Sequence, residues 1–104
     1  MGVSIASAAL SDADATETAA LFRALGDPAR VRIVNVVASS REPVCVCELV
    51  EVLGLAQPTV SHHLRRLVDA GLLAREERGK WSFFSIEPAA CLRLASLVDF
   101  EGCC

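Results

Sequence analysis

The sequence predicts one winged helix-turn-helix domain that is mainly α-helical, with about five helices and a two-stranded β-hairpin in 104 residues. Apolar residues recur at helical spacing up to residue 70, and glycines at positions 26, 54 and 71 interrupt this pattern where helices end. After position 71 the spacing changes from near 3.6 to two, across residues 72–77 and 80–86. These two segments flank Arg78-Gly79, so they predict a hairpin with a short turn.

The first two helices are predicted to meet at a sharp boundary. The first begins near Asp14 or Thr16 and ends at Gly26. The second covers residues 28–39, with Asp27 as its N-cap and a proline at its first position, where the missing N–H costs nothing. The apolar stripe expected on this second helix consists of Val31, Val34 and Val37.

Three further helices complete the predicted fold. Pro43 begins a helix that ends at residue 53, Gly54 forms the turn, and the next helix covers residues 57–70. The last helix starts at Pro88 and is apolar around most of its circumference, as expected for a helix buried on several sides. A homodimer interface would cover this helix and would account for the 53% hydrophobic content of so small a domain.

Composition and charge restrict the class of protein. No run approaches the roughly 18 apolar residues that a membrane-spanning helix needs, and the N-terminus lacks the pattern of a signal peptide. We therefore expect a cytoplasmic protein whose five cysteines are ligands or sensors rather than disulfides. The net charge is −3, yet residues 57–80 carry five cations against three carboxylates, which permits binding to nucleic acid.

The helix at residues 57–70 and the hairpin tip carry side chains suited to reading DNA. In a helix-turn-helix the second helix enters the major groove. Gln suits adenine, Arg suits guanine or phosphate, and Ser and Thr suit either. His62 and His63 are further donors to phosphate. The predicted DNA contacts are Gln57, Thr59, Ser61, His62, Arg65 and Arg66 on the helix, with Arg78 and Lys80 at the hairpin tip.

Four segments, residues 22–33, 45–49, 54–64 and 70–73, together resemble the arsenic-responsive repressor family ArsR/SmtB. The resemblance covers roughly residues 17–100. It implies a homodimer with the first and last helices at its interface, bound to an operator palindrome and released by an inducer.

The chain is then expected to divide into three parts. They are a flexible arm (residues 1–13), a DNA-binding and dimerisation domain (14–101) and a cysteine-containing tail (102–104).

Cys45-Val46-Cys47 is the predicted sensor, because family members that sense trivalent arsenic or antimony carry such a pair at this place. Thiolates are soft ligands, and a helix N-terminus favours the thiolate form. Residues i and i+2 of a helix point about 200° apart. We therefore expect that both sulfurs reach one arsenite or antimonite ion only if the start of this helix unwinds or tilts, and this helix positions the predicted DNA-reading helix.

The third thiolate has two candidate sources. Cys103 and Cys104 either complete the site at Cys45 and Cys47 or form a separate site, with or without Cys91. Cys91 is the weakest candidate, because it lies far along the last helix and a buried cysteine there is also a good packing residue.

Four other functions are considered: a thiol redox sensor, a cadmium or lead sensor, a zinc sensor and an enzyme. Two cysteines that oxidise to a disulfide or persulfide bridge would make a thiol redox sensor. Cys45 and Cys47 are too close for an easy bridge within a regular helix, whereas Cys91 could pair with a cysteine of the tail. Thiolate ligands also suit cadmium or lead. A zinc site on the last helix is disfavoured, because that helix has no histidine. No catalytic motif is visible, so we expect neither an enzyme nor a required cofactor.

Overall fold

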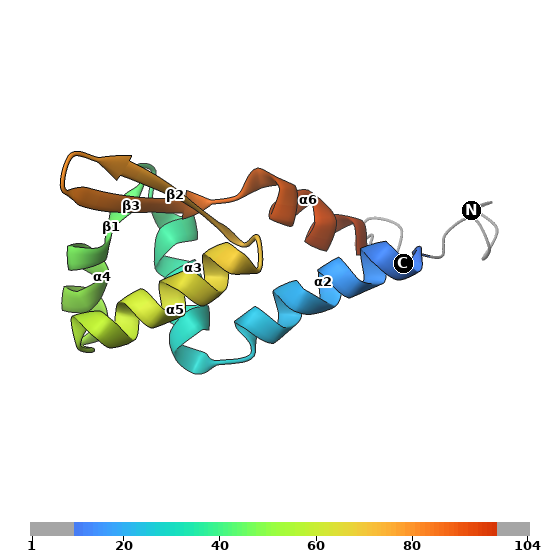
Figure 1. Cartoon of the computed structure of the whole chain (residues 1–104), viewed down its shortest axis with the longest axis horizontal. Helices are drawn as coiled ribbons and strands as arrows, with labels where there is room; N and C mark the ends of the chain where they lie inside the picture. Colours follow the sequence, from blue (N-terminus) through green and yellow to red (C-terminus); the bar gives the residue numbers. More distant parts are fainter. Residues whose placement is uncertain (1–9, 98–104) are drawn as a thin grey trace.

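Capping residues set where the first helices begin in the computed structural model, which describes residues 10–97 (Figure 1). Ser11 accepts a hydrogen bond from the backbone N–H of Asp14 (3.1 Å), so the first helix begins at Asp12, before the predicted start. Asp27 caps the next helix as predicted. The elements are α2 (Asp12–Leu25), α3 (Pro28–Ser39), β1 (Val44–Cys45), α4 (Val46–Leu53), α5 (Gln57–Asp69), β2 (Leu73–Arg78), β3 (Trp81–Ile86) and α6 (Pro88–Leu97).

The sheet has a third strand that the sequence pattern did not predict. The hairpin β2–β3 is confirmed, and β1 pairs antiparallel with the other edge of β3, in the order β1-β3-β2. Val44 lies opposite Phe84 and Cys45 lies opposite Phe83. The helix predicted from Pro43 therefore begins only at Val46, because the two residues before it are extended and bonded to the sheet.

One apolar core joins α3, α4, α5 and the sheet. Leu49 of α4 and Leu67 of α5 are fully buried, as predicted from the apolar spacing. On α3 the predicted stripe needs correction, because Val31 is half exposed while Ile33 is fully buried. Burying one such side chain contributes about 1.5–3 kcal/mol, so this core fixes how α4 and α5 pack beneath the hairpin.

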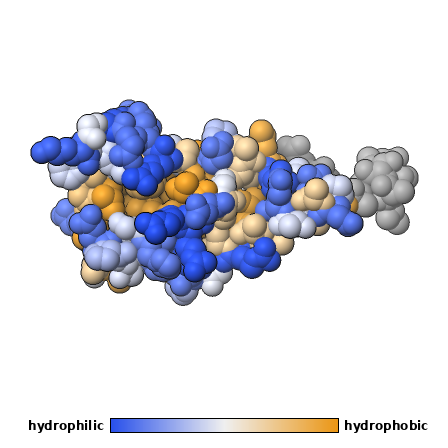
Figure 2. Space-filling model, viewed as in Figure 1, coloured by the Kyte–Doolittle hydropathy of each residue, from blue (hydrophilic) through white to orange (hydrophobic). Residues whose placement is uncertain are grey.

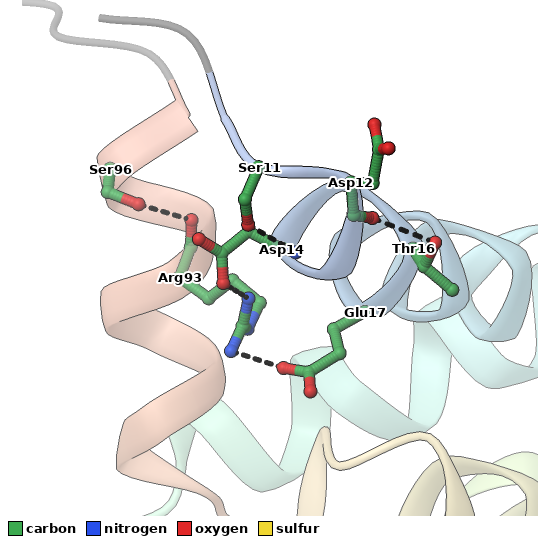
Figure 3. Close-up of polar contacts among 7 residues, drawn as sticks. All are labelled: Ser11, Asp12, Asp14, Thr16, Glu17, Arg93 and Ser96. Carbon is green, nitrogen blue, oxygen red and sulfur yellow. Dashed lines mark hydrogen bonds and ion pairs between the residues drawn. The ribbon is translucent and has the colours of Figure 1, made fainter. Parts of the chain in front are cut away.

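Helices α2 and α6 lie together at the end of the molecule away from the hairpin (Figure 1). The Arg93 guanidinium of α6 binds the carboxylates of Asp14 and Glu17 on α2, as Figure 3 shows. Only Ala90 is buried among the residues of α6, so within one chain this helix is not covered as predicted. Leu92 is 73% exposed. No helix within residues 10–97 is long and apolar enough to cross a membrane.

Candidate functional site

Helices α4 and α5 form a helix-turn-helix with a tight turn at Gly54. This glycine has φ 68°, in the left-handed region that favours glycine, and its N–H donates to the carbonyl of Val50 (3.0 Å). At the start of α5, Ala56 offers no side-chain cap and Pro58 has no N–H. The backbone N–H groups of Gln57 and Thr59 are thus left for an outside acceptor such as a phosphate.

The buried and exposed faces of α5 separate the core from the predicted DNA contacts. Val60, Leu64 and Leu67 are buried. Ser61 is half-buried, and the remaining predicted contacts on this helix are exposed: Gln57, Thr59, His62, Arg65 and Arg66. The structure thus brings these six side chains to one helix, next to the hairpin that carries Arg78 and Lys80.

His63 does not share the outward position of its neighbour. Its Nδ1 lies 3.3 Å from Nη1 of Arg30, on α3. A guanidinium only donates, so this Nδ1 is the acceptor and the ring proton is on Nε2. Arg30 also donates through Nε to the carbonyl of Ala24, at the end of α2. Through Arg30, His63 therefore links α5 to α3 and to the end of α2.

The two cations of the hairpin tip differ in their surroundings. The Arg78 guanidinium donates to both carboxylate oxygens of Glu76 (3.0 and 3.1 Å) and lies 4.7 Å from the centre of the Phe83 ring. The pKa of Arg78 is raised and that of Glu76 is lowered by their mutual hydrogen bonds and opposite charges. Within the described chain Lys80 has no ion pair. Lys80 is thus the cation more available to a phosphate.

The thiols of Cys45 and Cys47 face one another, contrary to the sequence prediction. Their sulfur atoms are 2.7 Å apart. Cys45 is the N-cap of α4 with extended backbone (φ −76°, ψ 148°), so the angular spacing of helical residues does not apply to it. Its Sγ accepts from the N–H of Cys47 (3.4 Å), while Glu48 accepts from the N–H of Cys45 (3.3 Å), a reciprocal capping box.

The proton on this pair is held in place by the same contact. The pKa of the Cys47 thiol is raised, first because its S–H donates to Cys45, and then because of partial burial and the charge of a Cys45 thiolate. Cys45 is only 4% exposed, whereas Cys47 is open to solvent. A soft ion would therefore meet Cys47 first and would displace protons from both sulfurs.

The other cysteines are not gathered here. Cys91 is exposed on α6, on a different element from the pair. Cys103 and Cys104 lie outside the described residues. Within residues 10–97 no three His, Cys, Asp or Glu side chains are placed to hold one ion. The pair itself lies where β1 joins the hairpin to α4, the first helix of the helix-turn-helix.

Two further positions near α5 were not singled out from the sequence. Arg75 of β2 lies beside α5 and donates to Glu77 and to Ser82 (3.1 Å). Arg30 was part of the segment that carries the family resemblance, and that segment was the only available signal for it.

Comparison with known proteins shows which family of regulators the chain resembles. Residues 27–75 match the model of bacterial regulatory proteins of the arsR family. The chain is 36% identical over 83 residues to an uncharacterised HTH-type transcriptional regulator of Methanocaldococcus jannaschii, covering 80% of this chain and 92% of that protein. It is 34% identical over 83 residues to the arsenical resistance operon repressor of Bacillus subtilis, covering 80% and 75%.

Solved structures agree with the fold. An ArsR family transcriptional regulator superposes with a TM-score of 0.68 at 26% identity, covering 79% of this chain and 82% of that one. A homodimeric winged helix-turn-helix DNA-binding domain from Mycobacterium bovis gives a TM-score of 0.69 at 24% identity, covering 89% and 87%. The predicted winged helix-turn-helix is thereby confirmed.

Proposed function

Because the chain belongs to the ArsR family of DNA-binding transcription regulators, which are not enzymes, we propose how it is controlled. It binds operator DNA as a homodimer and is released when trivalent arsenic or antimony binds the thiolates of Cys45 and Cys47. The observation that carries this proposal is the 2.7 Å contact between two soft ligands at the start of α4. Relatives from Bacillus subtilis and Escherichia coli are named arsenical resistance operon repressors.

DNA reading is assigned to the exposed face of α5 and to the hairpin tip. The side chains that contact bases are Gln57, Ser61 and Arg65, and the N-terminal N–H groups of α5 bind a phosphate. Thr59, His62, Arg66, Arg78 and Lys80 supply further contacts, mainly to the backbone. Two copies of the chain double these contacts and read a two-fold symmetric site.

Chelation disturbs the cap of α4 rather than a whole helical turn. Metal–sulfur bonds of about 2.3 Å at a right angle place two sulfurs about 3.3 Å apart. The two sulfurs are already in contact, so both can bind one ion after a small adjustment, and the ion takes the place of the S–H proton that joins them. Cys45 is fixed by β1 and by its own burial, so Cys47 moves and its N–H loses its acceptor. If operator DNA requires the intact cap, the ion and DNA favour different states.

The third ligand of the bound arsenic is either a hydroxide that arsenite retains or a third thiolate of the protein. Two thiols replace two hydroxides of arsenite, which leave as two waters with the thiol protons. The remaining hydroxide is replaced in the same way by Cys103 or Cys104, or those two residues form a site of their own, with or without Cys91. A count of protein thiols lost per bound arsenic distinguishes the two arrangements.

The test is an arsenite titration of the protein on a duplex selected by the protein itself from a random library. We expect arsenite to weaken this complex by about 5–150-fold, the usual range of such coupling. Cys45→Ser and Cys47→Ser must each abolish the response while the complex still forms. Cys91→Ser is the matched control, since Cys91 is an exposed cysteine away from the pair. A full response in either pair variant contradicts the proposal.

The same contact favours a second candidate, a thiol redox sensor. Sequence spacing argued against a bridge within the pair, but the sulfurs lie close together. Hydrogen peroxide would take two hydrogens from Cys45 and Cys47, leaving a disulfide and two waters. Release from DNA by peroxide without arsenite would favour this candidate. If cadmium or lead releases the protein from DNA at a lower concentration than arsenite does, only the identity of the inducer in the proposal changes.

A further inference from the structure

A cleft lies between α5 and the hairpin, and Val46, the residue between the two cysteines, is one of the residues that line it. Its volume is about 590 Å³, and its walls come from α5 on one side and from β2 and β3 on the other. Figure 2 shows apolar atoms between the hydrophilic surfaces of these two elements. Sites for small organic ligands have volumes of about 300–1,000 Å³, so the cleft has the size of such a site.

The walls combine an aromatic ring with aliphatic side chains. Trp81 of β3 lines the cleft and is 56% exposed. Much of this large apolar side chain is therefore left in contact with water. Val46 and Val68 line it as well and are half-buried. A DNA phosphate gains nothing from these apolar groups, whereas a planar ring stacks on an indole and covers them.

The charge of the cleft is mainly positive. Arg65, Arg75 and Lys80 line it, against a single carboxylate from Asp69. Arg75 is already paired with Glu77. Among residues 10–97, Arg65 and Lys80 take part in no ion pair. Two unpaired cations beside an apolar wall suit an anion with an aromatic body.

We propose that this cleft binds a small planar aromatic anion, with its ring against Trp81 and its carboxylate or sulfonate on Arg65 and Lys80. Such a ligand covers side chains that are also proposed to contact DNA, so it competes with DNA. That consequence, unlike the binding itself, rests on the proposed function. The chain would then respond to a second class of inducer without using its cysteines.

The binding test needs no DNA and uses 2-naphthoate as the probe. Trp81 is the only tryptophan, so its indole N–H gives one identifiable NMR signal. We expect this signal to shift in a saturable way with a Kd of about 1 mM or tighter. Neutral 2-naphthamide must bind more weakly, since it lacks the charge.

Two arginines of α5 make a matched pair of variants. Arg65→Ala should weaken naphthoate binding by about tenfold, as a charge-assisted hydrogen bond is lost. Arg66→Ala should leave it unchanged, because Arg66 is exposed outside the cleft. No saturable shift of the Trp81 signal, equal affinity for the amide, or equal losses in the two variants would overturn the proposal. If naphthoate binds but does not displace DNA, the cleft proposal stands and the assignment of DNA contacts fails.

Discussion

Replacing Gly54 by alanine isolates the contribution of the turn between α4 and α5. A Cβ built at this position meets nothing within 4 Å, so the substitution creates no clash. The cost comes only from the backbone, which has φ 68°. The left-handed conformation costs a non-glycine residue about 1–2 kcal/mol. Alanine also restricts the unfolded chain, which returns about 0.4–1 kcal/mol. The expected net loss of unfolding free energy is about 1 kcal/mol, from these two opposing terms.

The assay is thermal unfolding followed by circular dichroism at fixed protein concentration. A loss of about 1 kcal/mol lowers the Tm by about 4–8 °C in a domain of this size. Gly54→Asn is the matched variant, because asparagine tolerates the left-handed region better than alanine. We expect Gly54→Asn to lose less stability than Gly54→Ala. If alanine is as stable as glycine here, or asparagine is the worse of the two, the reasoning is refuted.

Three further predictions concern charge and assembly. Glu76→Gln removes the partner of Arg78, so binding to non-specific duplex should strengthen and its salt dependence should steepen by about one charge. An unchanged salt slope would contradict this. The pKa values of Asp27, Glu76 and Glu77 are lowered by hydrogen bonds, from backbone N–H groups for Asp27, from Arg78 for Glu76, and from Ser82 and Arg75 for Glu77. Their contribution to the free energy of unfolding is therefore full above about pH 4.5 and is lost as the pH falls below that value. In a variant with Asp27→Asn, Glu76→Gln and Glu77→Gln, the Tm should therefore depend less on pH below about 4.5. Leu92→Glu places a charge on the exposed apolar side of α6, so sedimentation should show a shift from dimer to monomer, and an unchanged dimer would place the interface elsewhere.

Local signals account for what the sequence predicted well. The helix α5 was predicted at residues 57–70 and is observed at Gln57–Asp69, because Pro58 and Gly71 mark its ends and apolar spacing marks its buried face. The hairpin is likewise defined by alternation on both sides of one turn. In these segments each structural cause lies within a few residues of its effect.

The missed features depend on residues far apart in the chain. The strand β1 has two residues, too few for an alternating pattern, and it exists because Phe83 and Phe84 lie about forty positions later. That pairing also moves the start of α4 from Pro43 to Val46, which turns Cys45 into an N-cap and brings its sulfur to Cys47. Cys45 and Cys47 remain candidate ligands named from the sequence, and the close approach of their sulfurs was not predicted.

The thiol pair and the cleft share one residue, which gives a final prediction. Val46 lies between the two cysteines and its side chain lines the cleft. If chelation moves Cys47, the adjacent Val46 shifts as well, and the wall that faces the aromatic ring changes. Arsenite should therefore weaken naphthoate binding, and naphthoate should weaken arsenite binding by the same factor, because coupling between two ligands is reciprocal.

The measurement is a pair of calorimetric titrations, each ligand with and without a saturating concentration of the other. Cys47→Ser provides the control, since it should bind naphthoate with the affinity of the wild type while showing no effect of arsenite. Equal affinities with and without the second ligand would mean that chelation leaves Val46 in place. The cap of α4 would then be too rigid to transmit binding at the cysteines to the neighbouring helix α5, and the proposed route from arsenite to DNA would fail with it.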